Sequence, residues 1–117
     1  MWWTEPDRLG RAAHELLAER SRDVHFSAIS VWEIANKSRL GKLPQVAWFE
    51  TEHARLVREN GFVMLNVTGD HALRAGYLPG DHRDPFDRLI AGQALVENMT
   101  VLTNDPQIGA FGCQVLW

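Results

Sequence analysis

The chain contains one cysteine, Cys113, among its 117 residues. A single cysteine excludes an internal disulfide, and no Cys/His spacing resembles a zinc site. Unbroken apolar runs such as Phe62–Leu65 stay far short of the roughly 18 residues that a membrane-spanning helix needs. The first residues also lack the basic start and apolar stretch of a secretory signal. These absences predict a cytoplasmic protein that does not cross a membrane.

An excess of positive charge is missing as well. The chain has 12 Lys and Arg residues against 15 Asp and Glu residues, which gives a net charge of −3. This balance argues against nonspecific polyanion binding, so any nucleic-acid contact needs local basic patches or bridging metal ions. With 45% hydrophobic and 23% charged residues, the chain matches an ordinary globular protein. Its length predicts a single domain over residues 1–117.

Short apolar segments with strand character alternate along the chain with segments of helical periodicity. Strands are predicted at 23–26, 62–67, 100–103 and 113–117, and the almost wholly apolar strand 62–67 is the type that is buried on both faces of a parallel sheet. Helices are predicted from Leu9 onward and at 28–40, 46–60, 68–77, 84–98 and 106–110, with Thr68 as the cap of the helix at 68–77. This alternation predicts an α/β domain with a mainly parallel sheet and helices on both faces. Ligands bind such sheets beyond the carboxyl ends of the strands.

Several acidic residues lie after the predicted strands or at the start of helices. Asp105 precedes Pro106 just after a strand, and Asp84 precedes Pro85 at the start of a long helix. Asp at the N-cap followed by Pro is a common helix start. Asp87 falls in the first turn, where a carboxylate suits the helix dipole. Capping alone explains each of these acids when each is considered alone.

Glu33 is harder to explain from local structure. If Ser27 caps the helix at 28–40, Glu33 falls on a largely apolar face beside Trp32. A carboxylate there needs a partner. Lys37, one turn later, offers an ordinary helix ion pair. An ion pair and a functional carboxylate therefore both stay open as interpretations.

Glu33, Asp87 and Asp105 are all placed to converge on one edge of the sheet. Carboxylates brought together repel one another unless they are protonated or neutralised by a cation. Hard oxygen ligands, together with water and phosphate, suit Mg²⁺ or Mn²⁺. Such an ion polarises a phosphoryl oxygen and lowers the pKa of a bound water. The three acids therefore favour a phosphodiester-cleaving site.

Three segments carry a longer pattern than helix caps require. They are FSAISVWEIA over 26–35, HRDPFDRLIAGQA over 82–94 and LTND over 102–105. Their order and spacing, over nearly the whole chain, resemble those of the PIN-domain ribonucleases and most closely the VapC-like toxins of bacterial toxin–antitoxin pairs. The middle segment is the most specific of the three.

The resemblance implies a parallel sheet flanked by helices, an acidic quartet holding Mg²⁺ or Mn²⁺, RNA as substrate, homodimerisation and an antitoxin partner. Glu33 matches the second acid of the quartet, Asp87 the third and Asp105 the fourth. Thr103 matches a hydroxyl near the site, and Asp84 is an accessory acid or simply a cap. The implied function is a metal-dependent endoribonuclease toxin that hydrolyses RNA phosphodiesters with a metal-activated water.

The pattern departs from the family at its beginning. Family members start with a hydrophobic strand that ends in Asp, the first metal ligand, and occupies the middle of the sheet. Here Trp2 and Trp3 match the stretch that follows this Asp, so we expect the first, central strand to be missing from this chain. A start codon assigned too far downstream is favoured over a truncated product because the remaining pattern is intact. The alternative function is a catalytically inactive PIN domain that binds only an antitoxin or a second copy.

Basic and aromatic residues accompany the acids. Lys37 follows Glu33 in a basic cluster, and Arg83 and Arg88 flank Asp87. A solvated face is the common meaning of such clusters, but beside a metal site these three cations are candidates to hold RNA phosphates. The aromatic residues Trp32 and Trp48 are expected to pack in the core or in a dimer contact.

Overall fold

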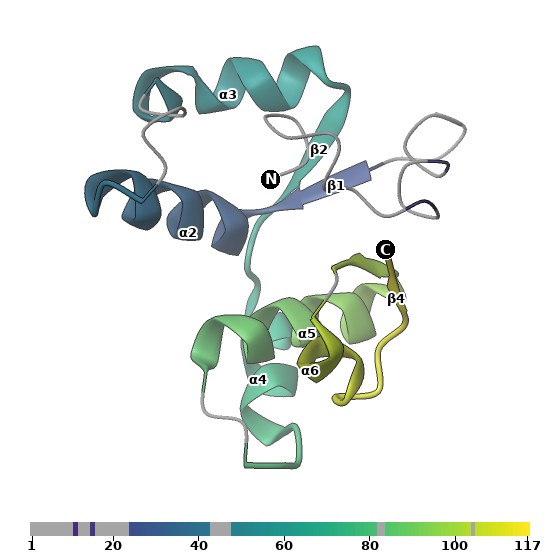
Figure 1. Ribbon diagram of the computed structural model, residues 1–117. Coiled ribbons are helices and arrows are strands. Elements are labelled where there is room, and N and C mark those ends of the chain that lie inside the picture. Colours follow the sequence, from purple (N-terminus) through teal and green to yellow (C-terminus); the bar gives the residue numbers. More distant parts are fainter. Residues whose placement is uncertain (1–10, 12–14, 16–23, 43–47, 82–83, 104) are drawn as a thin grey trace.

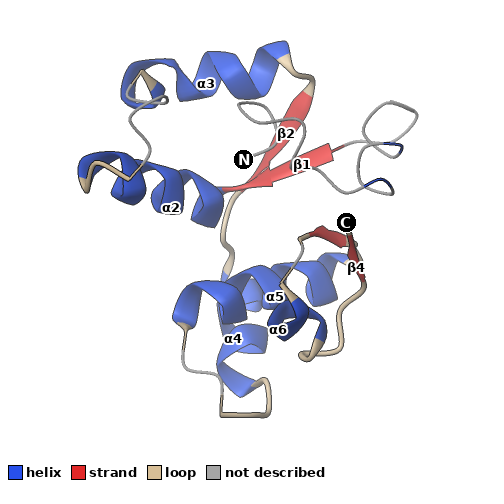
Figure 2. Ribbon diagram, viewed as in Figure 1, coloured by secondary structure: helices blue, strands red, loops and turns tan. Residues whose placement is uncertain are grey.

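The computed structural model describes residues 11, 15, 24–42, 48–81, 84–103 and 105–117. Its elements are β1 (Val24–Ser27), α2 (Ala28–Arg39), α3 (Phe49–Glu59), β2 (Phe62–Leu65), α4 (Gly69–Tyr77), α5 (Pro85–Glu97), β3 (Val101–Leu102), α6 (Pro106–Gly109) and β4 (Val115–Leu116). The predicted alternation of strands and helices is confirmed (Figures 1 and 2). Most of the helix predicted from Leu9 lies outside the described residues. No helix in the described ranges is both long and apolar enough to span a bilayer.

The strands form two small parallel sheets. β1 pairs with β2 in a register that runs from Val24 opposite Phe62 to Ser27 opposite Leu65. β3 pairs with β4 in a separate two-stranded sheet. The predicted α/β class with parallel strands is confirmed. The single continuous sheet is not found in the described part of the chain, where no ladder joins β1 to β3.

The first hydrophobic core lies between the β1–β2 sheet and the helices α2 and α3 (Figure 1). Its buried residues are Phe26, Ile34, Phe49 and Val57. Phe62 and Met64 of β2 pack against this cluster, whereas Val63 between them is 42% exposed. Successive side chains of a strand point to opposite faces. The prediction that this strand is buried on both faces is therefore wrong, because the core covers only the face of Phe62 and Met64.

A second core joins α4, α5 and α6. Its buried residues are Leu78, Ala91, Ala94, Ile108 and Cys113. The fully buried His71 of α4 lies beside it, where its Nδ1 accepts a hydrogen bond from the Thr68 N–H at 3.0 Å and its Nε2 lies 2.9 Å from Glu97 Oε1. The Thr68 side chain in turn accepts from the His71 N–H, which confirms the predicted cap of α4. The buried Cys113 thiol packs in this core, and burial raises its pKa.

Gly92 allows α5 to approach α4 closely. A Cβ at this position would lie 2.8 Å from the His71 carbonyl oxygen and 3.0 Å from Ala75 Cβ. Because a helix backbone cannot give way locally, we expect Gly92→Ala to lower the free energy of unfolding by about 1–3 kcal/mol, measured by urea denaturation. Gly76→Ala, with nothing within 4 Å of its Cβ, is the matched control and should be neutral or slightly stabilising. Equal stabilities for the two variants would contradict this account.

Candidate functional site

Two capped helix starts set the position of the predicted acids. The Ser27 hydroxyl accepts a hydrogen bond from the Ile29 N–H at 3.1 Å and begins α2. Asp84 Oδ1 accepts from the Phe86 N–H at 2.9 Å and the Asp87 N–H at 3.4 Å and begins α5. The predicted caps at both positions are confirmed. They place Asp87 in the first turn of α5, and Glu33 falls in the second turn of α2.

Glu33 lies in the electrostatic field of the acids on α5. Burial raises the pKa of its carboxyl above the ordinary value, and this is the largest influence. The positive charge of Lys37 lowers the pKa, whereas the negative charges of Asp87 and Asp84 raise it further. The net direction is upward. The structure therefore brings Glu33 together with Asp87 and Asp84, although these residues are far apart in sequence.

Gln93 holds α5 against the ends of the first sheet. Its side chain is 2% exposed, and its Oε1 accepts a hydrogen bond from the Ser27 hydroxyl at 2.5 Å. Its Nε2 faces the carbonyl oxygens of Leu65 and Asn66 at 3.5 and 3.4 Å. Sequence reasoning missed Gln93. The available signal was an amide between the small residues of an otherwise apolar helix stretch, where a buried polar group needs partners.

Trp32 and Phe86 form an aromatic stack between α2 and α5. Their ring centroids are 4.3 Å apart and the ring planes differ by 21°. Trp32 is 48% exposed and Trp48 is 40% exposed. The prediction that these two residues pack in the core is therefore wrong, because Trp32 lies over a ring of α5 and Trp48 begins α3 at the surface. A role in a dimer contact stays a prediction.

Asp105 lies at the other sheet, after β3. Its Oδ1 accepts a hydrogen bond from the Gln107 N–H at 2.9 Å, and its own N–H donates to Thr103 Oγ1 at 3.1 Å. The predicted cap of α6 is confirmed. Asp105 is not among the charges that shift the pKa of Glu33. Within the described ranges, no three His, Cys, Asp or Glu side chains are arranged to hold a metal ion.

The candidate RNA-binding cations have different surroundings. The Arg88 guanidinium donates to the carbonyl oxygens of Ala75, at 3.2 Å, and Leu78. It also lies 5.4 Å from the centre of the Phe111 ring. The structure thus gives Arg88 a role in joining α5 to the end of α4. Lys37 is exposed on α2, and Arg83 lies outside the described residues.

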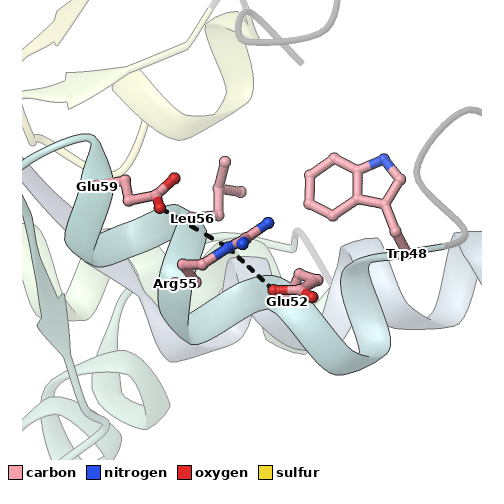
Figure 3. Close-up of a pocket in the computed structure, with 5 residues that line it drawn as sticks. All are labelled: Trp48, Glu52, Arg55, Leu56 and Glu59. Atoms are coloured by element: carbon pink, nitrogen blue, oxygen red, sulfur yellow. Dashed lines mark ion pairs between the residues drawn. The ribbon is translucent and has the colours of Figure 1, made fainter.

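Two surface hollows lie apart from the acids. One, of about 180 Å³, is on α3 (Figure 3) and is lined by Trp48, Glu52, Arg55, Leu56 and Glu59. In it Arg55 Nε pairs with Glu52 at 3.0 Å and Glu59 at 3.8 Å. The other, of about 360 Å³, is lined by Pro79, Gly80, Asp81, Gln107, Ala110 and Phe111. Neither hollow is lined by Glu33 or Asp87, so these carboxylates lie outside both.

The raised pKa of Glu33 gives a pH-dependent prediction. The folded chain holds this proton more tightly than the unfolded chain, so the charged form lowers stability at neutral pH, and this cost disappears as the pH falls through the folded and then the unfolded pKa. We expect Glu33→Gln to raise the free energy of unfolding at neutral pH by less than about 1 kcal/mol, because partial exposure lets water screen the charge.

Urea denaturation of both proteins near neutral pH and at a pH of about 4, around the unperturbed pKa of Glu, measures this difference. The gain should shrink at the lower pH. Glu50→Gln, at the exposed start of α3, is the matched control and should not gain stability at neutral pH. A gain that stays constant on acidification would contradict the raised pKa.

Gln93 gives a second testable prediction, at the contact between α5 and the ends of β1 and β2. Gln93→Leu keeps a similar volume but leaves the carbonyl oxygens of Leu65 and Asn66 without the amide. We expect it to lower the free energy of unfolding by about 1–3 kcal/mol, whereas Gln107→Leu on the exposed face of α6 should have little effect. A double-mutant cycle with Ser27→Ala should give a coupling energy above about 0.5 kcal/mol. Strictly additive effects would show that the Ser27 contact contributes nothing.

No curated protein and no solved structure gives a significant match to the chain. The family model of the PIN domain matches residues 1–112, which include α2, α5 and the acids that they carry. The predicted resemblance to PIN domains is confirmed, whereas the VapC-like subtype stays a prediction. The chain therefore belongs to the PIN domain family.

Proposed function

We propose that this protein is a metal-dependent endoribonuclease whose active-site carboxylates are Glu33, Asp87 and Asp105. PIN domains are generally metal-dependent nucleases that bind RNA. The observation that carries the proposal is the approach of α2 to α5, where Trp32 stacks on Phe86 and the negative charge of Asp87 raises the pKa of Glu33. Two helices from distant parts of the chain bring these carboxylates within each other's field, and a cation is the ordinary way to relieve such repulsion.

The donor set fits Mg²⁺. This ion is usually held by one or two carboxylates together with waters and substrate phosphates, and Glu33 and Asp87 supply two carboxylates. Mn²⁺ accepts the same hard oxygen ligands. Asp105 is the proposed third acid, since the segment over 102–105 resembles the one that carries the fourth acid of the family. When bound, the ion supplies the polarisation of a phosphoryl oxygen and the acidification of a water.

The remaining steps are assigned to side chains of the chain itself. Glu33 orients the attacking water and accepts its proton, the ordinary role of a carboxylate that acts as a general base. Asp84 fixes the first turn of α5 and thereby the position of Asp87. Thr103 holds the backbone of Asp105 through its hydroxyl. Lys37, on the same helix as Glu33, is the proposed cation for an RNA phosphate.

We further propose that the protein is a VapC-like toxin that acts in the cytoplasm, forms a homodimer and is bound by a cognate antitoxin. The resemblance of the three sequence segments supports this assignment. Apolar side chains on α4 also support a protein partner, since Leu73 is 62% exposed and Tyr77 is 83% exposed. These two residues lie one turn apart on one face of the helix. Such exposed apolar surface often marks a protein contact.

A second candidate is a catalytically silent PIN domain that binds only an antitoxin or a second copy. The observation that favours it is the lack, within the described ranges, of three side chains arranged to hold a metal ion. In this alternative, the Glu33 and Asp87 pair is a remnant of the nuclease site. The two candidates differ in one measurable property, the cleavage of RNA.

We expect the protein to cleave a mixed RNA pool with Mg²⁺ or Mn²⁺. The variant Asp87→Asn should lower the cleavage rate at least about 100-fold, because it removes the charge of a metal ligand and with it several kcal/mol of transition-state stabilisation. Asp70→Asn, the same change in the first turn of α4, is the matched control and should cleave as the unmodified chain does. Gel electrophoresis of labelled RNA measures both rates.

A chelator should stop the cleavage by the unmodified protein. Circular dichroism of each variant checks that the fold is retained. Full activity of Asp87→Asn would overturn the assignment of this residue. Absence of cleavage by the folded, metal-supplemented chain would favour the silent binding module.

A further inference from the structure

The stack of Trp32 on Phe86 leaves a large aromatic surface in water. Phe86 covers Trp32 at a centroid distance of 4.3 Å, and the ring planes are nearly parallel. Trp32 nevertheless keeps 48% of its surface exposed. A ring that is backed on one side and half exposed presents its other face to solvent. Its position is fixed by two helices, so the open face is preorganised for a flat partner.

This aromatic pair lies beside the proposed active site. Trp32 directly precedes Glu33 on α2, and Phe86 directly precedes Asp87 on α5. The negative charge of Asp87 acts on Glu33, so the contact that stacks the two rings also brings the two acids near each other. A molecule held at the acids is therefore within reach of the indole.

We propose that Trp32, backed by Phe86, binds an unpaired nucleobase of the RNA next to the scissile phosphate. This inference rests on the proposed nuclease function and adds a base-binding side chain to it. Single-stranded nucleic acids are held by aromatic rings on which bases stack, because every base has a flat π-face. A base inside a duplex is already stacked between its neighbours, so an unpaired segment is the preferred ligand.

The charges at the junction favour a nucleotide over an apolar protein segment. The open indole adjoins the acids of α2 and α5, and burial of these carboxylates under an apolar partner would leave charges without solvent. A nucleotide avoids this cost because its phosphate shares the cation that the carboxylates attract, while its base covers the indole. Lys37, whose positive charge also acts on Glu33, adds a second contact for the phosphate backbone.

Trp48 provides a matched control. It is 40% exposed, so its indole is nearly as accessible as that of Trp32. It makes a tilted contact with Phe49, with centroids 6.3 Å apart and ring planes at 60°. It borders the hollow on α3 in which Arg55 pairs with Glu52 and Glu59. The proposal therefore assigns base binding to the stacked indole of Trp32 and not to every exposed tryptophan.

The test measures binding apart from cleavage. The unmodified protein with Mg²⁺ serves as the parent, and fluorescence anisotropy follows a labelled 12-nucleotide single-stranded RNA with cleavage-resistant phosphorothioate linkages and its fully paired duplex. We expect Trp32→Ala in this background to bind the single strand roughly 5- to 100-fold more weakly, which is the range for loss of one base–aromatic stack. Trp32→Phe should keep most of the affinity, and Trp48→Ala should match the parent. Circular dichroism checks the fold.

Several results would overturn the base-binding role of Trp32. One is unchanged affinity of Trp32→Ala for the single strand. Another is an equal loss of affinity in Trp48→Ala, and a third is an equal loss of affinity for the duplex. A parent that binds no RNA would overturn it as well. RNA binding that depends on Trp32 in a chain that never cleaves would support the base-binding role of Trp32 and refute the proposed nuclease function. Cleavage that depends on Asp87 but not on Trp32 would refute the base-binding role and support the nuclease function.

Discussion

One buried amide joins α5 to the ends of the strands β1 and β2. Gln93 lies on α5, yet its partners are the Ser27 hydroxyl after β1 and the carbonyl oxygens that end β2. An amide offers a donor and an acceptor at fixed angles, so it sets orientation as well as distance. The relative position of α2 and α5, and therefore of Glu33 and Asp87, depends on this contact. The aromatic stack of Trp32 on Phe86 adds a second constraint at the surface of the same junction.

The elements and their starts could be predicted from sequence because local chemistry determines them. Ser27, Thr68, Asp84 and Asp105 each accept a hydrogen bond from the first turn of the helix that follows. Such caps need no distant partner. The strands could also be predicted from their short apolar runs. The nearness of Glu33 and Asp87 was expected from the predicted elements, and the charge of Asp87 acts on Glu33 in the structure, whereas a role of both residues in a metal site stays a prediction.

Tertiary partners decided what the sequence could not predict. Trp32 was expected in the core or in a dimer contact, but it stacks on the Phe86 ring at the surface and stays half exposed. Arg88 reads as a cation beside an acid, but its guanidinium has a fork of donors that reaches the carbonyl oxygens at the end of α4. Strand β2 was expected to be buried on both faces, but helices cover only one face of its sheet, so Val63 on the other face is exposed. Asp105 satisfied its predicted cap without entering the group around Glu33.

The two hydrophobic clusters share no buried residue. Cooperative unfolding units commonly follow such divisions, and amide hydrogen exchange can resolve them. The Glu33 and Asp87 pair exists only while both units are folded and docked, since each unit supplies one acid. Loss of docking would therefore abolish the site while the backbone amides of both cores stay protected. The surface that carries Glu33 and Asp87 therefore depends on the docking of the two units, and it reports on the coupling between them.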